Sequence, residues 1–218
     1  MIKPIAYINT DFKEKFGIPR QSGRVAEAIG KITFLPEFRN KDALRGLEEF
    51  SHIWIIFDFS LAHKQEWSPT VRPPRLGGNK RVGVFATRSP FRPNNIGLSS
   101  VKLLKIDGDE LIVSGVDLLD GTPIYDIKPY IPYTDCHTDA KGSFAQKEQN
   151  HSLEVNIEKE FLDKIPKEKQ KTLIGCLKDD PRPSYHNDTR TYTMKFDVFD
   201  ISFKVCDNAV IVTGIDKL

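Results

Sequence analysis

Two Asp-Gly pairs constrain the fold of this chain more than any other feature of its sequence. Asp107-Gly108 separates two short apolar runs, Leu98 to Ile106 and Leu111 to Val116. This arrangement predicts a β-hairpin, because glycine readily adopts the positive φ that tight hairpin turns require. Asp120-Gly121 predicts a second tight turn, just before a strand over Ile124 to Ile131. Antiparallel strands joined by short turns are therefore expected in the middle of the chain.

The rest of residues 1–140 also favours short strands over helices. Phe50 to Phe59 is rich in aromatic and β-branched residues and predicts a central strand, while Arg24 to Phe34 predicts one or two more. Asn40 to Gly46 is a candidate helical turn, and Thr134 to Asn150 is polar and predicts a linker or long loop. Many short strands with frequent turns favour a small antiparallel β-barrel, expected over residues 1–140.

The pattern changes after about Asn150. Glu158 to Ile165 and Lys167 to Lys178 each place apolar residues on one helical face, with a proline where the second helix would begin. Tyr192 to Val198 and Phe199 to Val205 alternate like strands, and the alternation slips by one residue between them, which implies a turn or bulge. The fold class expected is therefore mainly β, a barrel followed by a small α+β domain over residues 151–218.

Arginine and proline dominate the stretch from Thr70 to Asn95, which contains no acidic residue. Its prolines exclude helix and central strand over most of its length, so we expect two stiff loops around one short strand, Val82 to Ala86. Stiff loops hold guanidinium groups at low entropic cost, and guanidinium suits phosphate or carboxylate. Arginine-rich loops are also often simple solvated connections, but a purely solvated connection would have no use for large apolar side chains such as Phe91 and Leu98. The basic residues of the stretch are Arg72, Arg75, Lys80, Arg81, Arg88 and Arg92.

Charge and cysteine content exclude several classes of protein. The net charge of +2 is too small to indicate nucleic-acid binding by itself. Three cysteines without a Cys-x-x-Cys pair indicate neither a disulfide framework nor a zinc ribbon, and favour a reducing, cytoplasmic compartment. No signal peptide or membrane span is predicted. The cluster from Asp135 to Asp139, which includes Cys136 and His137, resembles metal ligands, but a polar linker explains it better, so no metal is expected.

A second arginine stands between two prolines near the C-terminus. Arg182 is followed closely by Tyr185. A rigid cation beside an aromatic ring is a combination that single-stranded RNA recognition uses, the cation for a phosphate and the ring for a base. An exposed proline-rich turn with a packed tyrosine explains the same residues equally well, and both interpretations stay open on sequence alone.

Seven sequence words occur in order over nearly the whole chain, at residues 16–21, 46–54, 72–78, 83–94, 96–99, 119–123 and 180–183. In these words the chain resembles the TsaA-like (TrmO) tRNA (adenine-N6)-methyltransferase family. This resemblance implies a β-barrel methyltransferase without a Rossmann core, assembled as a homodimer. It also implies S-adenosylmethionine as cofactor and, as substrate, the threonylcarbamoyl-modified adenosine at tRNA position 37, methylated on N6. The sequence has no Gly-x-Gly-x-x-Gly after a strand, in agreement with this.

The same resemblance implies the residues that bind the cofactor. Asp120 suits a ribose diol, and Arg88 or Arg20 suits the carboxylate. Ser60 and Leu61 stand where many relatives have His-Gln, which leaves backbone contacts there. Asn95 replaces the usual proline, so a looser loop is expected. The full set implied is Pro19, Arg20, Gln21, Ser60, Leu61, Arg88, Leu98, Leu118, Leu119, Asp120 and Gly121.

Methyl transfer to a urea-like N6 also needs a group to take its proton, unless positioning alone carries the catalysis. Asp120, Tyr125 and Asp126 lie at or just after the predicted cofactor turn and are the candidates. Tyr125 could instead be an edge-strand core residue, and Asp126 a solvated loop acid.

For tRNA, we expect phosphate contacts from the arginine-rich stretch and a grip on the anticodon loop from the C-terminal domain. The arginines could instead serve a dimer contact or the barrel rim. Two other functions stay open: a non-catalytic RNA-binding barrel, and a methyltransferase with a different substrate. The residues expected to contact RNA are Arg72, Arg75, Arg81, Arg92, Arg182 and Tyr185.

Overall fold

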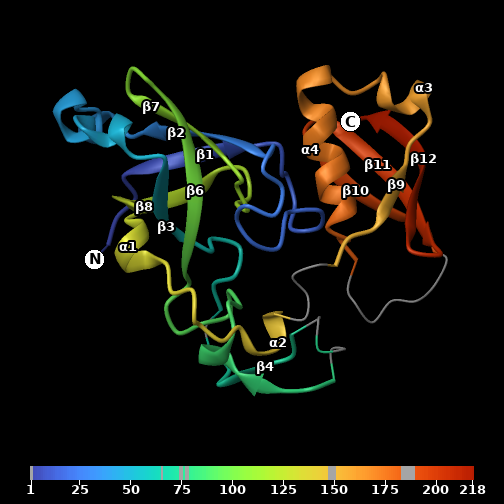
Figure 1. Ribbon diagram of the computed structural model, residues 1–218, viewed down its shortest axis with the longest axis horizontal. Coiled ribbons are helices and arrows are strands. Elements are labelled where there is room, and N and C mark those ends of the chain that lie inside the picture. Colours follow the sequence, from blue (N-terminus) through green and yellow to red (C-terminus); the bar gives the residue numbers. More distant parts are fainter. Residues whose placement is uncertain (1, 65, 74–75, 77–78, 147–150, 183–189) are drawn as a thin grey trace.

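The structure is a computed structural model of the 218-residue chain. It describes all residues except 1, 65, 74–75, 77–78, 147–150 and 183–189. Six antiparallel strands close into a barrel in the order β1-β2-β7-β6-β3-β8 (Figure 1), as the sequence predicts. They are β1 (Ala6–Thr10), β2 (Ile29–Phe34), β3 (His52–Asp58), β6 (Ile96–Asp107), β7 (Glu110–Ser114) and β8 (Thr122–Pro129).

Alternation along these strands fills the barrel with apolar side chains. In β3, Ile53, Ile55 and Phe57 are buried while the residues between them are partly exposed. The predicted hairpin joins β6 to β7, and Gly108 adopts a φ of 65° in its turn. Gly97 in β6 faces the Phe57 ring so closely that an added Cβ would lie 2.2 Å from it. The large aromatic side chain therefore fits the barrel only because its neighbour on β6 has no side chain.

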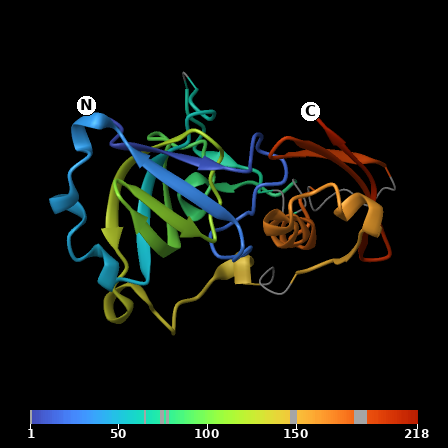
Figure 2. The ribbon, with the colours of Figure 1, turned by 90° about the horizontal axis from the view of Figure 1, so that it is seen from above.

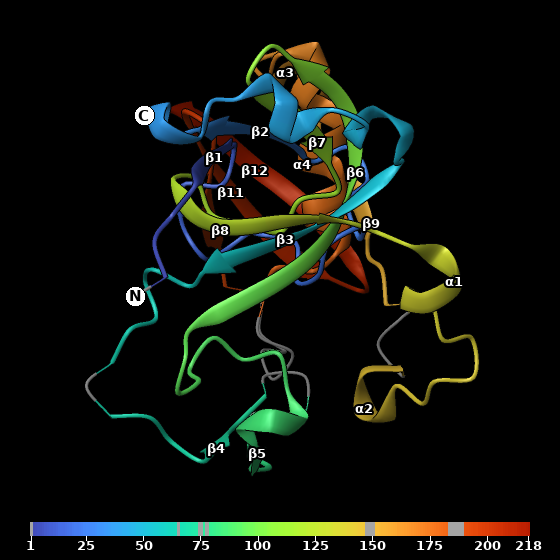
Figure 3. The same ribbon diagram turned by 90° about the vertical axis from the view of Figure 1, so that its left-hand side faces the viewer.

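The described parts of residues 64–95 form an arm, which lies well below the barrel strands in Figure 3. The arm contains a two-stranded sheet of β4 (Thr70–Val71) and β5 (Val82–Gly83). The strand predicted over Val82 to Ala86 is wrong in its second half, because the chain turns into a 3₁₀ helix over Val84–Ala86. Burial of the Val84 side chain and a bond from its amide to the Pro69 carbonyl (2.9 Å) hold the bend.

Short helices fill the connections of the barrel unit. The helical turn predicted near residues 40–46 forms as 3₁₀ segments, and the Asn40 side chain caps the first of them by accepting from the Asp42 amide (2.9 Å). The predicted polar linker carries two helical turns. These elements are η1 (Pro36–Phe38), η2 (Lys41–Leu44), η3 (Leu47–Glu49), α1 (Pro132–Asp135) and α2 (Ser143–Gln146).

The C-terminal unit is a four-stranded sheet packed beside one long helix. Strand order is β10-β11-β12-β9, with β9 parallel to β12. The slip in alternation predicted near Val198 is a hairpin turn, in which Asp197 takes a φ of 53°. The elements are β9 (Glu154–Asn156), α3 (Lys159–Leu162), α4 (Lys167–Lys178), β10 (Tyr192–Phe196), β11 (Phe199–Cys206) and β12 (Ala209–Lys217).

A continuous hydrophobic cluster joins the two units, which lie side by side in Figure 2. Phe12 meets Phe196 edge to face at 6.4 Å, and Gly175 of α4 lets that helix approach the Val25 side chain. Lys169 of α4 forms ion pairs with Asp11 (2.7 Å) and with the hairpin residue Asp197 (2.6 Å). Within the described residues, no helix is both long and apolar enough to cross a membrane.

Candidate functional site

The loop after β1 brings several predicted cofactor residues to one side of the barrel. The side-chain amide oxygen of Gln21 accepts a hydrogen bond from Arg88 at the base of the arm. The next residue, Ser22, donates its backbone amide to the Asp117 carboxylate. Gly23 donates to the Gly115 carbonyl (2.8 Å), which fastens the loop to the segment that leads into the Asp-Gly turn. Three stretches far apart in sequence therefore meet here.

Asp117 is the centre of this meeting point, and sequence reasoning did not identify it. Ser99 donates its hydroxyl to the Asp117 carboxylate (2.6 Å). Burial raises the pKa of Asp117 above its ordinary value, and the hydrogen bonds together with the positive charge of Arg88 only partly oppose this. The sequence showed only an acid three residues before Asp120, and nothing local indicated its partner Ser99, which lies on β6.

The Asp120-Gly121 turn adopts the predicted conformation. Gly121 has a φ of 73°, and an added Cβ would meet nothing within 4 Å, so the backbone is open to close approach. Asp120 accepts from the Thr10 amide and from the Lys13 ammonium, both at 2.9 Å. Burial alone would raise the pKa of Asp120, but these bonds outweigh burial and lower it. Asp120 is therefore an ionised acceptor and a weak base at neutral pH.

Ser60 and Leu61 lie on an exposed turn that other segments hold in place. Lys15, from the loop after β1, donates to the Leu61 carbonyl (2.8 Å). The Asn95 side chain donates to the carbonyls of Ala62 (3.3 Å) and Pro90 (2.7 Å). The Asn95 amide thus joins both sides of the loop before β6, and the looser loop expected from the missing proline stays a prediction.

Tyr125 sits at an irregularity in β8 and contacts an acid of β3. Pairing between β3 and β8 shifts at this point, so that Phe57 pairs with Ile124 and Ile56 with Asp126, leaving Tyr125 out of register. Burial raises the pKa of Tyr125, as do the charge of Asp58 and the hydrogen bond to it, so the phenol stays protonated and donates. The same Asp58 carboxylate lies 2.8 Å from Nε2 of the exposed His63.

The remaining predicted catalytic and cofactor residues are placed as follows. Asp126 accepts from the Ile127 amide and pairs with Lys128 (both 2.9 Å), on the exposed part of β8. Leu98 projects from β6 with 55% of its surface exposed. Pro19 and Leu118 are buried, and Leu119 is partly buried. Leu98 therefore supplies exposed apolar surface on the outer face of β6, while the buried Ser99 side chain, on the opposite face, binds Asp117.

Arg20 faces the C-terminal unit. Its guanidinium donates to the carbonyls of Asp180 (3.1 Å) and Arg182, and its amide donates to Asp179 (3.3 Å). Arg182 itself forms a two-pronged ion pair with Asp180, through Nε (2.9 Å) and Nη2 (3.1 Å). The two side chains are only 11% and 10% exposed. The structure thus gives both arginines internal partners, and Tyr185 lies outside the described residues.

The arginines of the arm have a different setting. Arg72 and Arg81 are exposed, and Arg81 donates to the Thr70 hydroxyl (2.9 Å). Arg92 donates to the Thr87 (2.8 Å) and Val84 (3.2 Å) carbonyls, so it braces the 3₁₀ turn. Within the part of the chain that the structure describes, none of these three arginines pairs with an acid; Arg75 lies outside that part.

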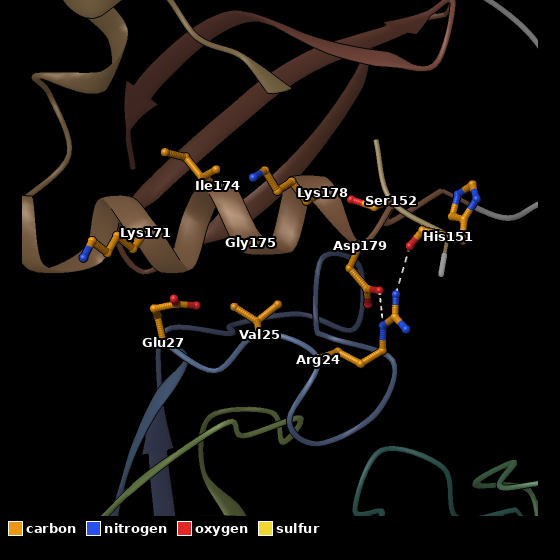
Figure 4. Close-up of a pocket in the computed structure, with 10 residues that line it drawn as sticks. All are labelled: Arg24, Val25, Glu27, His151, Ser152, Lys171, Ile174, Gly175, Lys178 and Asp179. Carbon is orange, nitrogen blue, oxygen red and sulfur yellow. Dashed lines mark hydrogen bonds and ion pairs between the residues drawn. The ribbon is translucent and has the colours of Figure 1, made fainter. Parts of the chain in front are cut away.

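A pocket of about 510 Å³ opens between the two units. Figure 4 shows Arg24 of its lining, paired with Asp179 and donating to the His151 carbonyl (3.0 Å). One lining residue, Arg24, directly follows Gly23, so the pocket adjoins the loop that bonds to Asp117. Across the described ranges, no group of three or more metal-ligating side chains is found. The pocket is lined by Arg24, Val25, Glu27, His151, Ser152, Lys171, Ile174, Gly175, Lys178 and Asp179.

Comparison with known proteins decides the family. A family model for the tRNA-methyltransferase O N-terminal domain matches residues 7–136, and one for the TrmO C-terminal domain matches residues 150–218. The chain belongs to the TrmO family. The resemblance stated from the sequence words is thereby confirmed, and the TrmO models also match both structural units.

Relatives of this TrmO chain extend over nearly its full length. The tRNA (adenine(37)-N6)-methyltransferase of Escherichia coli is 43% identical over 93% of this chain and 92% of the relative. The human protein of the same name is 37% identical over 87% of this chain, which spans 43% of the human protein. The crystal structure of TrmO from Pseudomonas aeruginosa matches with a TM-score of 0.81 and 33% identity, covering 99% of this chain and 98% of that one. The barrel without a Rossmann core is therefore the fold of this family.

Proposed function

We propose that this chain transfers a methyl group from S-adenosylmethionine to N6 of adenosine 37 in tRNA, and that the threonylcarbamoyl-modified base is its substrate. The observation that carries the proposal is the 43% identity over 93% of the chain to an enzyme named for this reaction. The convergence of Gln21, Arg88, Asp117 and the Asp120 turn on one side of the barrel supports it.

The cluster fits the chemistry of this cofactor. Apolar surface for an adenine comes from Leu98 and Leu61, which are exposed although large and apolar. The open backbone at Gly121 and the ionised Asp120 suit a ribose, and Arg88 is an exposed cation for a carboxylate. We therefore retain the eleven cofactor residues expected from the family. Because Arg20 is already bonded to the C-terminal unit, we assign the carboxylate to Arg88.

Among the three candidate proton acceptors, the geometry favours Tyr125. The bound cofactor supplies an activated methyl group, so the protein has to align the acceptor nitrogen and remove its proton. Asp120 is a weak base because its pKa is lowered, and Asp126 is already paired with Lys128. Tyr125 can take the N6 proton on its phenol oxygen while its own proton passes to Asp58. His63 contacts the same carboxylate and connects it to solvent.

The same proposal covers the partners. The tRNA anticodon loop is assigned to the arm, through Arg72, Arg75, Arg81 and Arg92, and to the C-terminal unit near Arg182 and Tyr185. Arg182 is proposed to shape its loop through Asp180, since its guanidinium is buried in that pair. A homodimer and a cytoplasmic location belong to the proposal as well, with residues 1–140 and 151–218 as its two domains.

The experiment that tests the function is methyl transfer from labelled cofactor to tRNA, with and without the threonylcarbamoyl group. Transfer only to the modified tRNA supports the proposal, and transfer to neither form contradicts it. Calorimetry with S-adenosylmethionine separates the rival explanations, because an RNA-binding barrel without catalysis would not bind the cofactor.

The proton relay has its own test in single-turnover rates at saturating cofactor. Tyr125→Phe and Asp58→Asn are expected to slow methyl transfer by roughly 10²–10⁴-fold, the usual contribution of a general base. Asp126→Asn is the matched control on the same strand and should stay near the wild-type rate, and Asp120→Asn should act on cofactor affinity. Near-normal rates in both the Tyr125 and Asp58 variants would leave positioning as the source of catalysis.

A further inference from the structure

The arm exposes aromatic rings as well as arginines. Trp67 is 50% exposed and Phe85 is 72% exposed, although burial of such rings normally stabilises a fold. Their centroids lie 6.1 Å apart with planes inclined by 32°. The two rings thus form one exposed aromatic surface, although Trp67 precedes β4 in the sequence and Phe85 follows β5.

Cations lie against the aromatic rings of the arm. The Arg92 guanidinium is 5.7 Å from the centroid of Phe85, and the Lys64 ammonium is 4.3 Å from the centroid of Phe91. Arg92 is held in place by the Val84 and Thr87 carbonyls. No acid occurs from Thr70 to Asn95. The surface therefore combines flat apolar faces with an excess of positive charge.

We propose that Trp67 and Phe85 form a stacking platform for unpaired bases of the tRNA anticodon loop, flanked by Arg72, Arg81 and Arg92 as phosphate contacts. This inference rests on the proposed function, and it adds the part of the site that binds bases. Aromatic faces beside a basic track are the means by which proteins bind single-stranded RNA, since every base has a face that can stack. The phosphates that flank each base account for the excess of cations.

Charge favours an RNA loop over a second copy of the chain as the molecule that binds this surface. A self-complementary interface would bring the arm's arginines and lysines close to those of its copy, and the arm offers one acid, Glu66, to compensate them. An RNA loop brings its own negative charge. The second copy is therefore the outcome that the experiment has to exclude.

Tryptophan fluorescence reports directly on this platform. The chain has two tryptophans, so a Trp54→Phe background leaves Trp67 as the sole emitter. We expect a synthetic anticodon stem-loop RNA to quench Trp67 emission saturably, with the same Kd as the anisotropy of the labelled RNA. No quenching at concentrations that saturate the anisotropy would overturn the proposal.

Affinity measurements provide the second readout. Trp67→Ala and Phe85→Ala should each weaken binding of the stem-loop roughly 5- to 150-fold, as expected for one stacked base, without changing the salt dependence. Trp67→Phe should restore most of the affinity, and Tyr133→Ala, an exposed aromatic residue of α1, should leave it unchanged. If the alanine variants kept their RNA affinity but had a lower mass than the wild-type protein by light scattering, the rings would belong to an interface with a second copy instead.

Methyl transfer by the wild-type protein on the same RNA keeps the two proposals apart. If methylation occurs but the alanine variants bind normally, the platform is wrong and the proposed function stands. If Trp67 is quenched as expected but no methyl group is transferred to modified RNA, the platform stands and the proposed function fails.

Discussion

The two arginine-proline segments of this chain look alike in sequence but have opposite surroundings in the structure. In the arm, Arg72 and Arg81 are exposed, and no described acid pairs with them. At the junction between the units, Arg182 is 11% exposed and holds both carboxylate oxygens of Asp180. The difference lies in the neighbouring residues, since two aspartates precede the second segment and none occurs in the first. Prolines restrict the backbone beside an arginine, and local acids decide whether its guanidinium is paired within the chain.

The strongest test of this comparison is Arg182→Ala. Removing one partner of a buried ion pair leaves the other charge without compensation, which typically costs about 3–5 kcal/mol. We expect a loss of this size in the free energy of unfolding, measured by urea denaturation with far-UV circular dichroism. Arg72→Ala, the exposed counterpart, should change it by less than about 0.5 kcal/mol. Equal effects of the two substitutions would break the comparison.

Asn95→Ala tests how the arm is attached to the barrel. Its side-chain amide makes two hydrogen bonds between neutral groups, to Ala62 and Pro90, and each such bond contributes about 0.5–1.5 kcal/mol. We expect the free energy of unfolding to fall by about 1–2 kcal/mol. Because no charges are involved, the loss should be the same in low and high salt. A strongly salt-dependent loss would mean that electrostatic pairs hold the base of the arm.

Acidification should weaken the junction. Burial raises the pKa of Asp180, but Arg182 and His151 outweigh burial and hold it below the ordinary 3.8. A carboxylate with a lowered pKa stabilises the folded state at pH values above its unfolded pKa, and this stabilisation is lost as the pH falls through the folded pKa. Wild-type protein should therefore lose more stability than Asp180→Asn as the pH falls below about 3.8. Denaturant midpoints at several acidic pH values measure this, and parallel curves for the two proteins would contradict it.

The smallest effect expected is on the salt dependence of RNA binding. Each phosphate contact contributes about 0.7 to the slope of log K against log salt for single strands and about 0.9 for duplexes. Arg72→Ala and Arg81→Ala should each lower the slope by that amount with the fold intact, while Arg182→Ala should leave the slope of its folded fraction unchanged. A reduced slope for Arg182→Ala, measured where the variant is still folded, would place that arginine on the RNA.

Local sequence patterns predicted the elements of the fold well. The Asp107-Gly108 hairpin, the Asp120-Gly121 turn and the barrel as a class follow from turn chemistry and alternation, which act over a few residues. The short strand at Val82 was extended too far, because burial of Val84 depends on tertiary contacts.

The candidate site was predicted only in part, because its bonds join distant residues. Gln21 and Arg88 are 67 positions apart, and Thr10 and Asp120 are 110 apart. The family words supplied most of these residues, but not Asp117, Asp58 or His63. Each of these three acquires its role from a partner on another strand or turn, which no local pattern reveals.

The loop from Pro19 to Gly23 is hydrogen-bonded both to the C-terminal unit and to the barrel unit. Arg20 holds the backbone of residues 180–182, while Gln21 and Ser22 hold Arg88 and Asp117. The loop therefore connects the segment after α4 to the side of the barrel where the methyl donor is expected. Thermodynamic linkage then requires reciprocity: if docked RNA tightens the hold on the donor, the donor tightens the hold on RNA by the same factor.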